Sequence, residues 1–338
     1  MMPAHLRGRV LLVALAATVA AVLPAGAQEE CVAIRARRIL PVCPDLPWEI
    51  EDGVIVVRNG RIAAIGADAE IPPGAKVIEF PFGTVIPGLV AAATDLGGRH
   101  RGDESIAAGY RAVDAFNRYG NYAETLSAGV TAVHLSPGSH RLLTGQGAVV
   151  KLGGGPSGRV LRPHADLTIN LGPGVYRPPL DVTYSFPASA DVPIPLPRRQ
   201  RPDSAMGQWL GLEEAIRRAL EGEQPEPVSL HGPALARAWQ EGLPLRFHAN
   251  RAADLLGAIR FLKKHKRRGY LVGGAEAEKV SEAIRDARLP LVYQPRYRFG
   301  APGDNLGTDP DVLAAEVRDF RRLAGVTLAL APPAGEAA

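Results

Sequence analysis

The sequence predicts an α/β protein, in which a small β-rich domain precedes a (β/α)8 TIM-type barrel. Three observations support this fold class. Residues 32–84 alternate apolar and polar side chains, as half-buried strands do. From residue 84 onward, short apolar runs alternate with helical stretches, the pattern of βα units around a parallel sheet. Eight such runs occur, the number that closes a barrel of this type.

The first residues have the pattern of a signal peptide. Arg7 and Arg9 precede an apolar run, and Ala25-Gly26-Ala27 supplies small residues for cleavage. The apolar run of about 15 residues is shorter than the ~20 that a membrane-spanning helix needs. We therefore expect residues 1–27 to be removed from an exported protein, periplasmic or secreted, without a stable membrane anchor. A retained N-terminal anchor is the alternative.

The mature chain carries almost no net charge. Residues 1–27 hold two arginines and no acids, so 39 basic residues become 37, and 35 acidic residues leave a charge of +2. Nucleic-acid-binding proteins concentrate basic residues on one face. The one basic run here, residues 263–268, is predicted to end a helix, where cations are favourable. We therefore expect no nucleic-acid partner.

The two cysteines of the chain, Cys31 and Cys43, lie close together near the mature N-terminus. In an exported protein such a pair is expected to form a disulfide. The closed loop is short, so we expect stabilisation near the low end of ~2–4 kcal/mol. Metal binding by the two thiols is the alternative.

Residues 28–83 are predicted to form the small β-rich domain. Val54–Val57 and Ile62–Gly66 are two apolar runs that flank Asn59-Gly60. Both turn residues tolerate the positive φ of a type I′ turn, so the segment predicts a β-hairpin. Residues 71–80 add another short strand.

Residues 84–338 are predicted to form the barrel. Helices are expected at Leu255–Lys264 and Glu276–Ala287. Reactive groups of such a barrel lie at the C-terminal ends of its strands. The eight expected strands are Thr84–Ala93, Val130–Ser136, Ala148–Leu152, Leu167–Leu171, Leu243–Ala249, Gly269–Val272, Leu289–Gln294 and Val326–Ala331.

Two features interrupt this regular pattern. Residues 172–203 are dense in proline, which fixes φ and removes hydrogen-bond donors, so we expect an extended excursion on the surface. The chain ends seven residues after the eighth strand, so we expect the eighth helix to be missing.

Several segments resemble those of the amidohydrolase superfamily. Residues 83–97, which include Val85-Ile86-Pro87-Gly88-Leu89, are similar to its first barrel strand. Residues 127–139 and 145–152 look like those of the imidazolonepropionase-like branch of these metallo-dependent hydrolases, and residues 245–249 and 276–280 add further similarity. The resemblance extends over nearly the whole mature chain. It implies a barrel with a small β domain, although a shared fold does not fix an activity.

The resemblance also implies a metal site that this sequence lacks in large part. Active members hold a divalent metal with histidines from strands one, five and six, sometimes with a lysine from strand four, and use an aspartate after strand eight as a base. Only His248, on strand five, matches a ligand of this set. The other positions fall on Ala93 and Asp95 of strand one, Thr168 of strand four, Gly273 of strand six and Pro333 after strand eight. The chain is thus predicted to be a degenerate member, since a catalytic zinc needs about three protein ligands.

Other residues could rebuild such a site. The Asp95 carboxylate can bind a hard cation, and His134 and Lys151, near the ends of strands two and three, could reach the same mouth of the barrel. Asp95, His134 and His248 together form a chemically possible site for zinc or another divalent metal. No residue replaces the aspartate base, however.

These observations favour a catalytically inactive protein, a pseudoenzyme or partner subunit of an active amidohydrolase, with no cofactor expected. The resemblance implies a protein partner, in a homo- or hetero-oligomer, because this superfamily often associates through barrel flanks and small β domains. One alternative is a metal-dependent hydrolase of C–N (amide or peptide) or ester bonds that uses the rebuilt site. Another is a small-ligand-binding protein that uses the barrel mouth.

Overall fold

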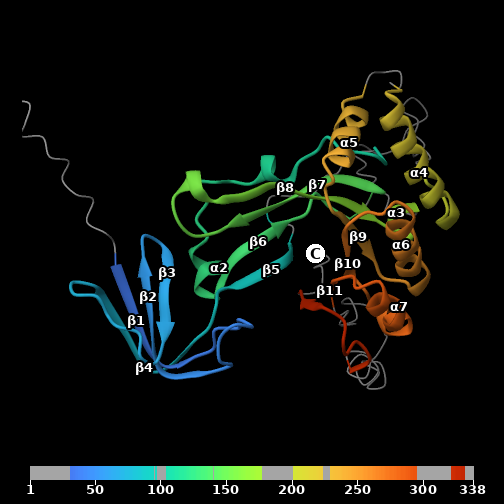
Figure 1. The fold of residues 1–338 in the computed structure, drawn as a ribbon. Coiled ribbons are helices and arrows are strands. Elements are labelled where there is room, and N and C mark those ends of the chain that lie inside the picture. Colours follow the sequence, from blue (N-terminus) through green and yellow to red (C-terminus); the bar gives the residue numbers. More distant parts are fainter. Residues whose placement is uncertain are drawn as a thin grey trace, which may run out of the picture. The chain divides into compact units, whose positions relative to one another are not determined.

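The chain divides into two compact units, Met1–Pro87 and Gly88–Ala338. The computed structural model describes residues 31–94, 96, 104–139, 141–176, 201–223, 229–294 and 321–331 (Figure 1). The expected signal peptide, Asp95, Pro333 and residues 177–200 of the proline-rich excursion lie outside the described residues. Within the described residues, no helix has the length and apolar character needed to cross a membrane.

The first unit contains a four-stranded sheet with the strand order β3-β2-β1-β4. The predicted hairpin is confirmed, because Asn59 (φ 49°) and Gly60 (φ 73°) turn the chain between β2 and β3. β1 pairs with β2 in the antiparallel and with β4 in the parallel direction. The strands are β1 (Cys31–Ile39), β2 (Ile50–Arg58), β3 (Arg61–Gly66) and β4 (Lys76–Val85).

Strand β4 lies at one edge of this sheet and is exposed along most of its length. Ile78, Phe80 and Phe82 are exposed apolar residues on it. Thr84 and Val85, which the sequence analysis assigned to the first barrel strand, belong to β4, because they pair with Arg38 and Ile39 of β1.

The expected disulfide is not formed, and Cys31 and Cys43 are free thiols. Cys31 begins β1, and Cys43 lies four residues beyond its other end. A strand rises about 3.3 Å per residue, so the ends of β1 are roughly 26 Å apart. Four further residues span at most about 14 Å, whereas a disulfide needs Cα atoms within ~7 Å. The short spacing along the sequence misled the prediction because the chain between the cysteines is extended.

The second unit is built around an eight-stranded sheet, ordered β12-β11-β10-β9-β8-β7-β6-β5. Side chains from its two end regions meet, since Ala92 and Ala93 pack against Val272, Val292 and Ala331, and the barrel is therefore nearly closed. The strands are β5 (Leu89–Thr94), β6 (Val130–Leu135), β7 (Leu143–Lys151), β8 (Val160–Asn170), β9 (Leu245–Ala249), β10 (Gly269–Gly273), β11 (Leu291–Tyr293) and β12 (Leu328–Leu330).

One strand of the barrel runs in the opposite direction to that predicted. β7 pairs with both β6 and β8 in the antiparallel direction, while every other pair in this sheet is parallel. Only seven residues, 136–142, separate β6 from β7. A parallel crossover needs about a dozen residues, so a connection this short forces the reversal. The expectation of a regular (β/α)8 barrel is wrong at this strand.

Helices cover the barrel strands on their outer side. Helix α4 begins after Ser204, whose side chain accepts a hydrogen bond from the Gly207 amide, and ends at Gly222 in the left-handed region. Figure 1 shows α3 to α7 along one flank of the strands. The α-helices are α2 (Ala123–Ser127), α3 (Pro173–Tyr176), α4 (Ala205–Glu221), α5 (His231–Gln240), α6 (Ala252–Lys264) and α7 (Ser281–Asp286), with 3-10 turns η1 (Ala112–Ala115), η2 (Pro156–Gly158) and η3 (Ala277–Val280).

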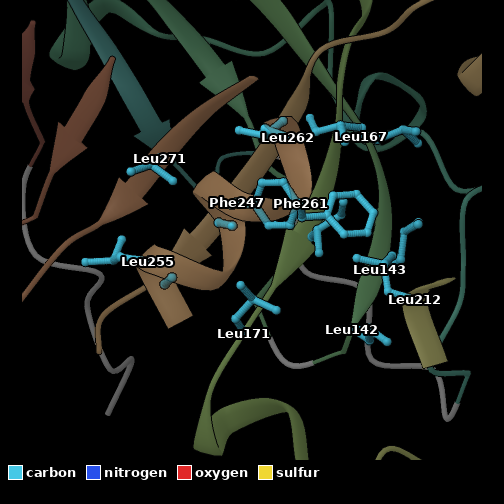
Figure 2. Packing of buried hydrophobic residues seen from close by; sticks show 14 of the residues in the cluster. Leu142, Leu143, Leu167, Leu171, Leu212, Phe247, Leu255, Phe261, Leu262 and Leu271 are labelled. Atoms are coloured by element: carbon cyan, nitrogen blue, oxygen red, sulfur yellow. The ribbon is translucent and has the colours of Figure 1, made fainter. Parts of the chain in front are cut away.

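The main core lies between the barrel strands and these helices. Phe247 of β9 is fully buried and meets Phe261 of α6 with ring centroids 5.7 Å apart, in an edge-to-face arrangement (Figure 2). Leucines of β8, α4 and α6, among them Leu167, Leu212 and Leu262, surround this pair. The apolar faces of β8 and β9 thus pack against the helices outside the barrel. Their other faces line the barrel interior.

Candidate functional site

The inner faces of β8 and β9 are polar. On β8, Asp166, Thr168 and Asn170 alternate with apolar residues, and all three are buried. Arg246 and His248 of β9 lie beside Thr168 and Asn170 in the strand register, and therefore on the same face. Because neighbouring residues of a strand point to opposite sides, this polar set faces into the barrel.

Asp166 is the centre of a hydrogen-bonded cluster that we call the interior cluster, formed by His134, Asp166, Thr168, Arg246 and Tyr270. The Asp166 Oδ2 atom lies 2.6 Å from His134 Nε2 and accepts a hydrogen bond of 2.9 Å from the Tyr270 hydroxyl. Its Oδ1 atom accepts one of 3.1 Å from Thr168 Oγ1. Residues of β6, β8 and β10 thus meet at one carboxylate.

A glycine makes the contact between His134 and Asp166 possible. Gly147 lies on β7, between β6 and β8, and pairs with Asp166. A Cβ atom at this position would lie 2.6 Å from both His134 Nε2 and Asp166 Oδ1. The imidazole and the carboxylate therefore meet directly above the Gly147 backbone.

The charges of the interior cluster depend on one another. Burial raises the pKa of Asp166, but the nearby His134, Arg246 and Tyr270 outweigh this effect and hold the pKa below its ordinary value. Burial and the Asp166 charge raise the pKa of Tyr270. Arg246, only 4% exposed, contributes a buried guanidinium. At neutral pH the cluster therefore holds a carboxylate, a guanidinium and a protonated phenol.

Further polar contacts continue from the cluster toward the C-terminal end of β8. Asn170 Nδ2 donates to the carbonyl oxygen of Arg141 at 2.8 Å and lies 3.3 Å from Thr144 Oγ1. Arg246 Nη1 lies 3.5 Å from Ser136 Oγ. Three buried atoms have no hydrogen-bond partner within the described part of the chain, namely His134 Nδ1, Asn170 Oδ1 and Arg246 Nε.

Of the three candidate metal ligands of the sequence analysis, the structure describes His134 and His248. His134 is buried in the interior cluster, and His248 is half-buried on β9, beside Asn170 and Val272 in the register. Asp95 lies outside the described residues. Across residues 31–94, 96, 104–139, 141–176, 201–223, 229–294 and 321–331, no three His, Cys, Asp or Glu side chains are placed to hold a metal ion.

The other positions implied by the resemblance lie in different parts of the chain's structure or outside the described residues. Ala93 packs against the cluster of Val272, Val292 and Ala331. Thr168 belongs to the interior cluster, and Gly273 ends β10 in the left-handed region with φ 95°. Pro333 lies outside the described residues.

The prediction for Lys151 was wrong, because its side chain does not lie at the barrel mouth. It ends the reversed strand β7 and pairs with Ala132, near the start of β6. Its exposed side chain therefore lies toward the end of the barrel opposite the C-terminal ends of the parallel strands. The prediction assumed a parallel strand.

The interior cluster does not fit a divalent metal. Arg246 offers no lone pair, and its fixed positive charge disfavours a second cation beside Asp166. Each Asp166 oxygen already has a hydrogen-bond partner in His134, Thr168 or Tyr270. Hydroxyl groups and a guanidinium are not the ligands that zinc prefers.

Three members of the interior cluster, Asp166, Arg246 and Tyr270, were not predicted from the sequence. A signal for the first two exists in the strict alternation of residues 166–170 and 245–249, where every second residue is polar. In a strand of a buried sheet, such a pattern predicts a polar inner face. No comparable signal marks Tyr270, since its role depends on its place two strands from Asp166, on the other side of β9.

Comparisons with known proteins agree with this architecture. The structure is similar to an amidohydrolase from Thermotoga maritima MSB8, with a TM-score of 0.66 and 22% sequence identity over 89% of this chain and 78% of that chain. A prolidase complexed with N-methylphosphonate-L-proline (TM-score 0.47, 15% identity, 90% and 79% of the two chains) and molinate hydrolase (0.42, 17%, 91% and 73%) are more distant. Neither a protein-family model nor a curated protein matches the sequence. The chain therefore has the fold of an amidohydrolase.

Proposed function

We propose that this chain is an exported, catalytically inactive protein of the amidohydrolase type, a pseudoenzyme that acts as the partner subunit of an active homologue. The observation that carries the proposal is the bonding of Asp166. The buried acid of the barrel interior is held by His134, Thr168 and Tyr270 and lies near a guanidinium. An acid engaged in this way neither binds a metal nor accepts a proton from a water molecule.

The donor set of the barrel supports the absence of metal-dependent hydrolysis. That reaction needs a metal-bound water, which in turn needs about three protein ligands and an open position. The described residues bring no such set together, and His134 is engaged with Asp166. We accordingly expect the purified protein to need no cofactor.

Strand β4 supports a protein partner. It pairs only with β1 among the described strands, and its apolar residues Ile78, Phe80 and Phe82 are exposed. An exposed apolar edge strand is a site at which another chain can add. We propose that this edge contacts the partner subunit, a second copy or an amidohydrolase homologue.

Metal analysis together with hydrolysis assays tests the proposed inactivity. The mature chain, purified without chelators, is expected to contain far less than one equivalent of zinc or manganese and to hydrolyse neither amide nor ester substrates. Near-stoichiometric metal, lost together with hydrolysis in His248→Ala, would instead establish a working metal-dependent hydrolase.

Purification from the native host tests the partner and the export. We expect the chain to begin at Gln28 outside the cytoplasm and to elute in a complex, which Phe80→Asp on the β4 edge dissociates. Glu51→Lys on β2, also exposed, is the control that leaves the complex intact. A stable monomer in the native extract contradicts the partner role.

A second candidate is a small-ligand-binding protein. The three buried polar atoms without partners, His134 Nδ1, Asn170 Oδ1 and Arg246 Nε, favour it, because such atoms are costly unless something bonds to them. A screen of small polar metabolites by thermal shift tests this candidate, with Asn170→Leu as the variant that loses the response.

A further inference from the structure

The interior cluster contains a buried acid, Asp166, that needs a compensating positive charge. Asp166 is 1% exposed and accepts hydrogen bonds from two hydroxyl groups, so it is present as a carboxylate. A buried charge is unfavourable unless an opposite charge lies near it. In a barrel with a metal centre, a divalent ion supplies positive charge, but the residues here do not fit such an ion.

His134 Nε2 lies 2.6 Å from Asp166 Oδ2 but is charged only when protonated, whereas Arg246 is placed to supply a fixed positive charge. In the strand register its neighbour on β8 is Thr168 and its neighbour on β10 is Tyr270. These are the two residues whose hydroxyl groups donate to Asp166. The guanidinium therefore lies on the strand between the two donors, on the same inner face.

Among the described residues, the other groups that interact with the Arg246 side chain are neutral. They are the Tyr270 hydroxyl and Ser136 Oγ, which lies 3.5 Å from Nη1, while Nε has no hydrogen-bond partner there. Arg246 acts on Asp166 through the electrostatic field inside the barrel rather than through a direct ion pair. A buried guanidinium without an acid of its own is therefore balanced by Asp166.

We propose that Arg246 is the resident cation of this barrel. Its fixed charge compensates Asp166 in place of a divalent metal, so that β6, β8, β9 and β10 are held together without one. This inference rests on the proposed function, in which the barrel binds no metal, and it explains how the fold remains stable in that state.

A charge cycle at residues 246 and 166 tests the inference. Arg246→Met keeps a flexible, unbranched side chain and removes the charge, so the melting temperature is expected to fall on the order of 10 °C. Arg246→Lys, the matched control that keeps the charge, is expected to lose less than half as much. In the double variant Arg246→Met/Asp166→Asn, the acid no longer needs a cation, and at least half of the loss is expected to be recovered.

Each result of the cycle decides the inference. If Arg246→Met alone does not fold but the double variant does, the inference is supported in its strongest form. If the double variant is no more stable than Arg246→Met, or if both fail to fold, charge compensation is not the role of Arg246 and the inference is overturned.

Zinc and EDTA separate this inference from the proposed function. Neither is expected to move the melting temperature of the wild-type protein. Stabilisation of the wild type by zinc contradicts the proposed function. If zinc leaves the wild type unchanged and Asp166→Asn does not rescue Arg246→Met, only the role of Arg246 is contradicted.

Discussion

Position 147 shows how closely single residues determine the barrel interior. Gly147 leaves room for His134 and Asp166 to meet over the β7 backbone. Two polar side chains from different strands share this space, and both are buried. The absence of a side chain at one position thus permits a contact between two others that are 32 residues apart in the sequence.

Gly147→Ala is expected to destabilise the protein by about 1–3 kcal/mol, because the new methyl group overlaps His134 and Asp166. Chemical denaturation monitored by circular dichroism measures the change. Gly155→Ala is the matched control, since no atom lies within 4 Å of a Cβ built there and its φ is −69°. A Gly147→Ala variant as stable as the control would mean that the two side chains can part without cost.

Asp166 makes the stability of the protein depend on pH. Its pKa in the folded state lies below the ordinary value of 3.8, so its contribution to stability is complete above that pH and is lost as the pH falls toward the folded-state pKa. Asp166→Asn is expected to cost about 3 kcal/mol at pH 7 and to remove this part of the acid sensitivity. Melting temperatures between pH 2.5 and 7 test the expectation, and parallel profiles for the two proteins would refute it.

At the scale of secondary structure, much of the architecture could be predicted from the sequence. Apolar runs mark the strands, and the Asn59-Gly60 turn marks the hairpin, because these signals are local. The direction of β7 was missed, although the short connection between β6 and β7 carries the information. The boundary of β5 was missed because Thr84 and Val85 pair with β1, a contact between distant parts of the chain.

The candidate site was predicted less completely for the same reason. His134 was identified as a residue of the barrel, but its partner Asp166 depends on the register of β6, β7 and β8. Tyr270 reaches Asp166 across β9. Such contacts are set by strand pairing and are not visible in any one segment of sequence.

The packing between β9 and α6 lies in the main core of the barrel unit. Phe247→Ala is expected to cost about 3–5 kcal/mol, since a fully buried ring is lost between Trp209 and Phe261. Phe82→Ala, at a ring that is 91% exposed, is the control and is expected to change stability by less than about 0.5 kcal/mol. Urea unfolding of both variants measures the difference, and equal effects would contradict the position of the core.

At the scale of the whole molecule, the two units differ in how they are stabilised. The barrel unit has a large core between sheet and helices, whereas the four-stranded unit has two small apolar clusters, one on each face of its sheet. A small domain of this kind often depends on a disulfide. The free Cys31 and Cys43 imply that this one does not.

The double variant Cys31→Ser/Cys43→Ser is therefore expected to unfold within about 0.5 kcal/mol of the wild type under oxidising conditions. Addition of a reducing agent is expected to change neither protein. If the cysteines were joined, breaking the bond would cost roughly 2–3 kcal/mol. A wild-type protein that loses stability on reduction while the double variant does not would establish the bond.

The reversal of β7 also identifies a segment suitable for chemical labelling. β7 runs antiparallel to β6 and β8, so it ends where these parallel strands begin. Residues 152–159, which connect β7 to β8, therefore lie at the end of the barrel opposite the C-terminal ends of the parallel strands. Gly154 and Gly155 are exposed in this segment. A fluorophore or tether attached there lies at the opposite end of the barrel from the C-terminal ends of the parallel strands, so the protein can be immobilised or tracked without a change to the interior cluster.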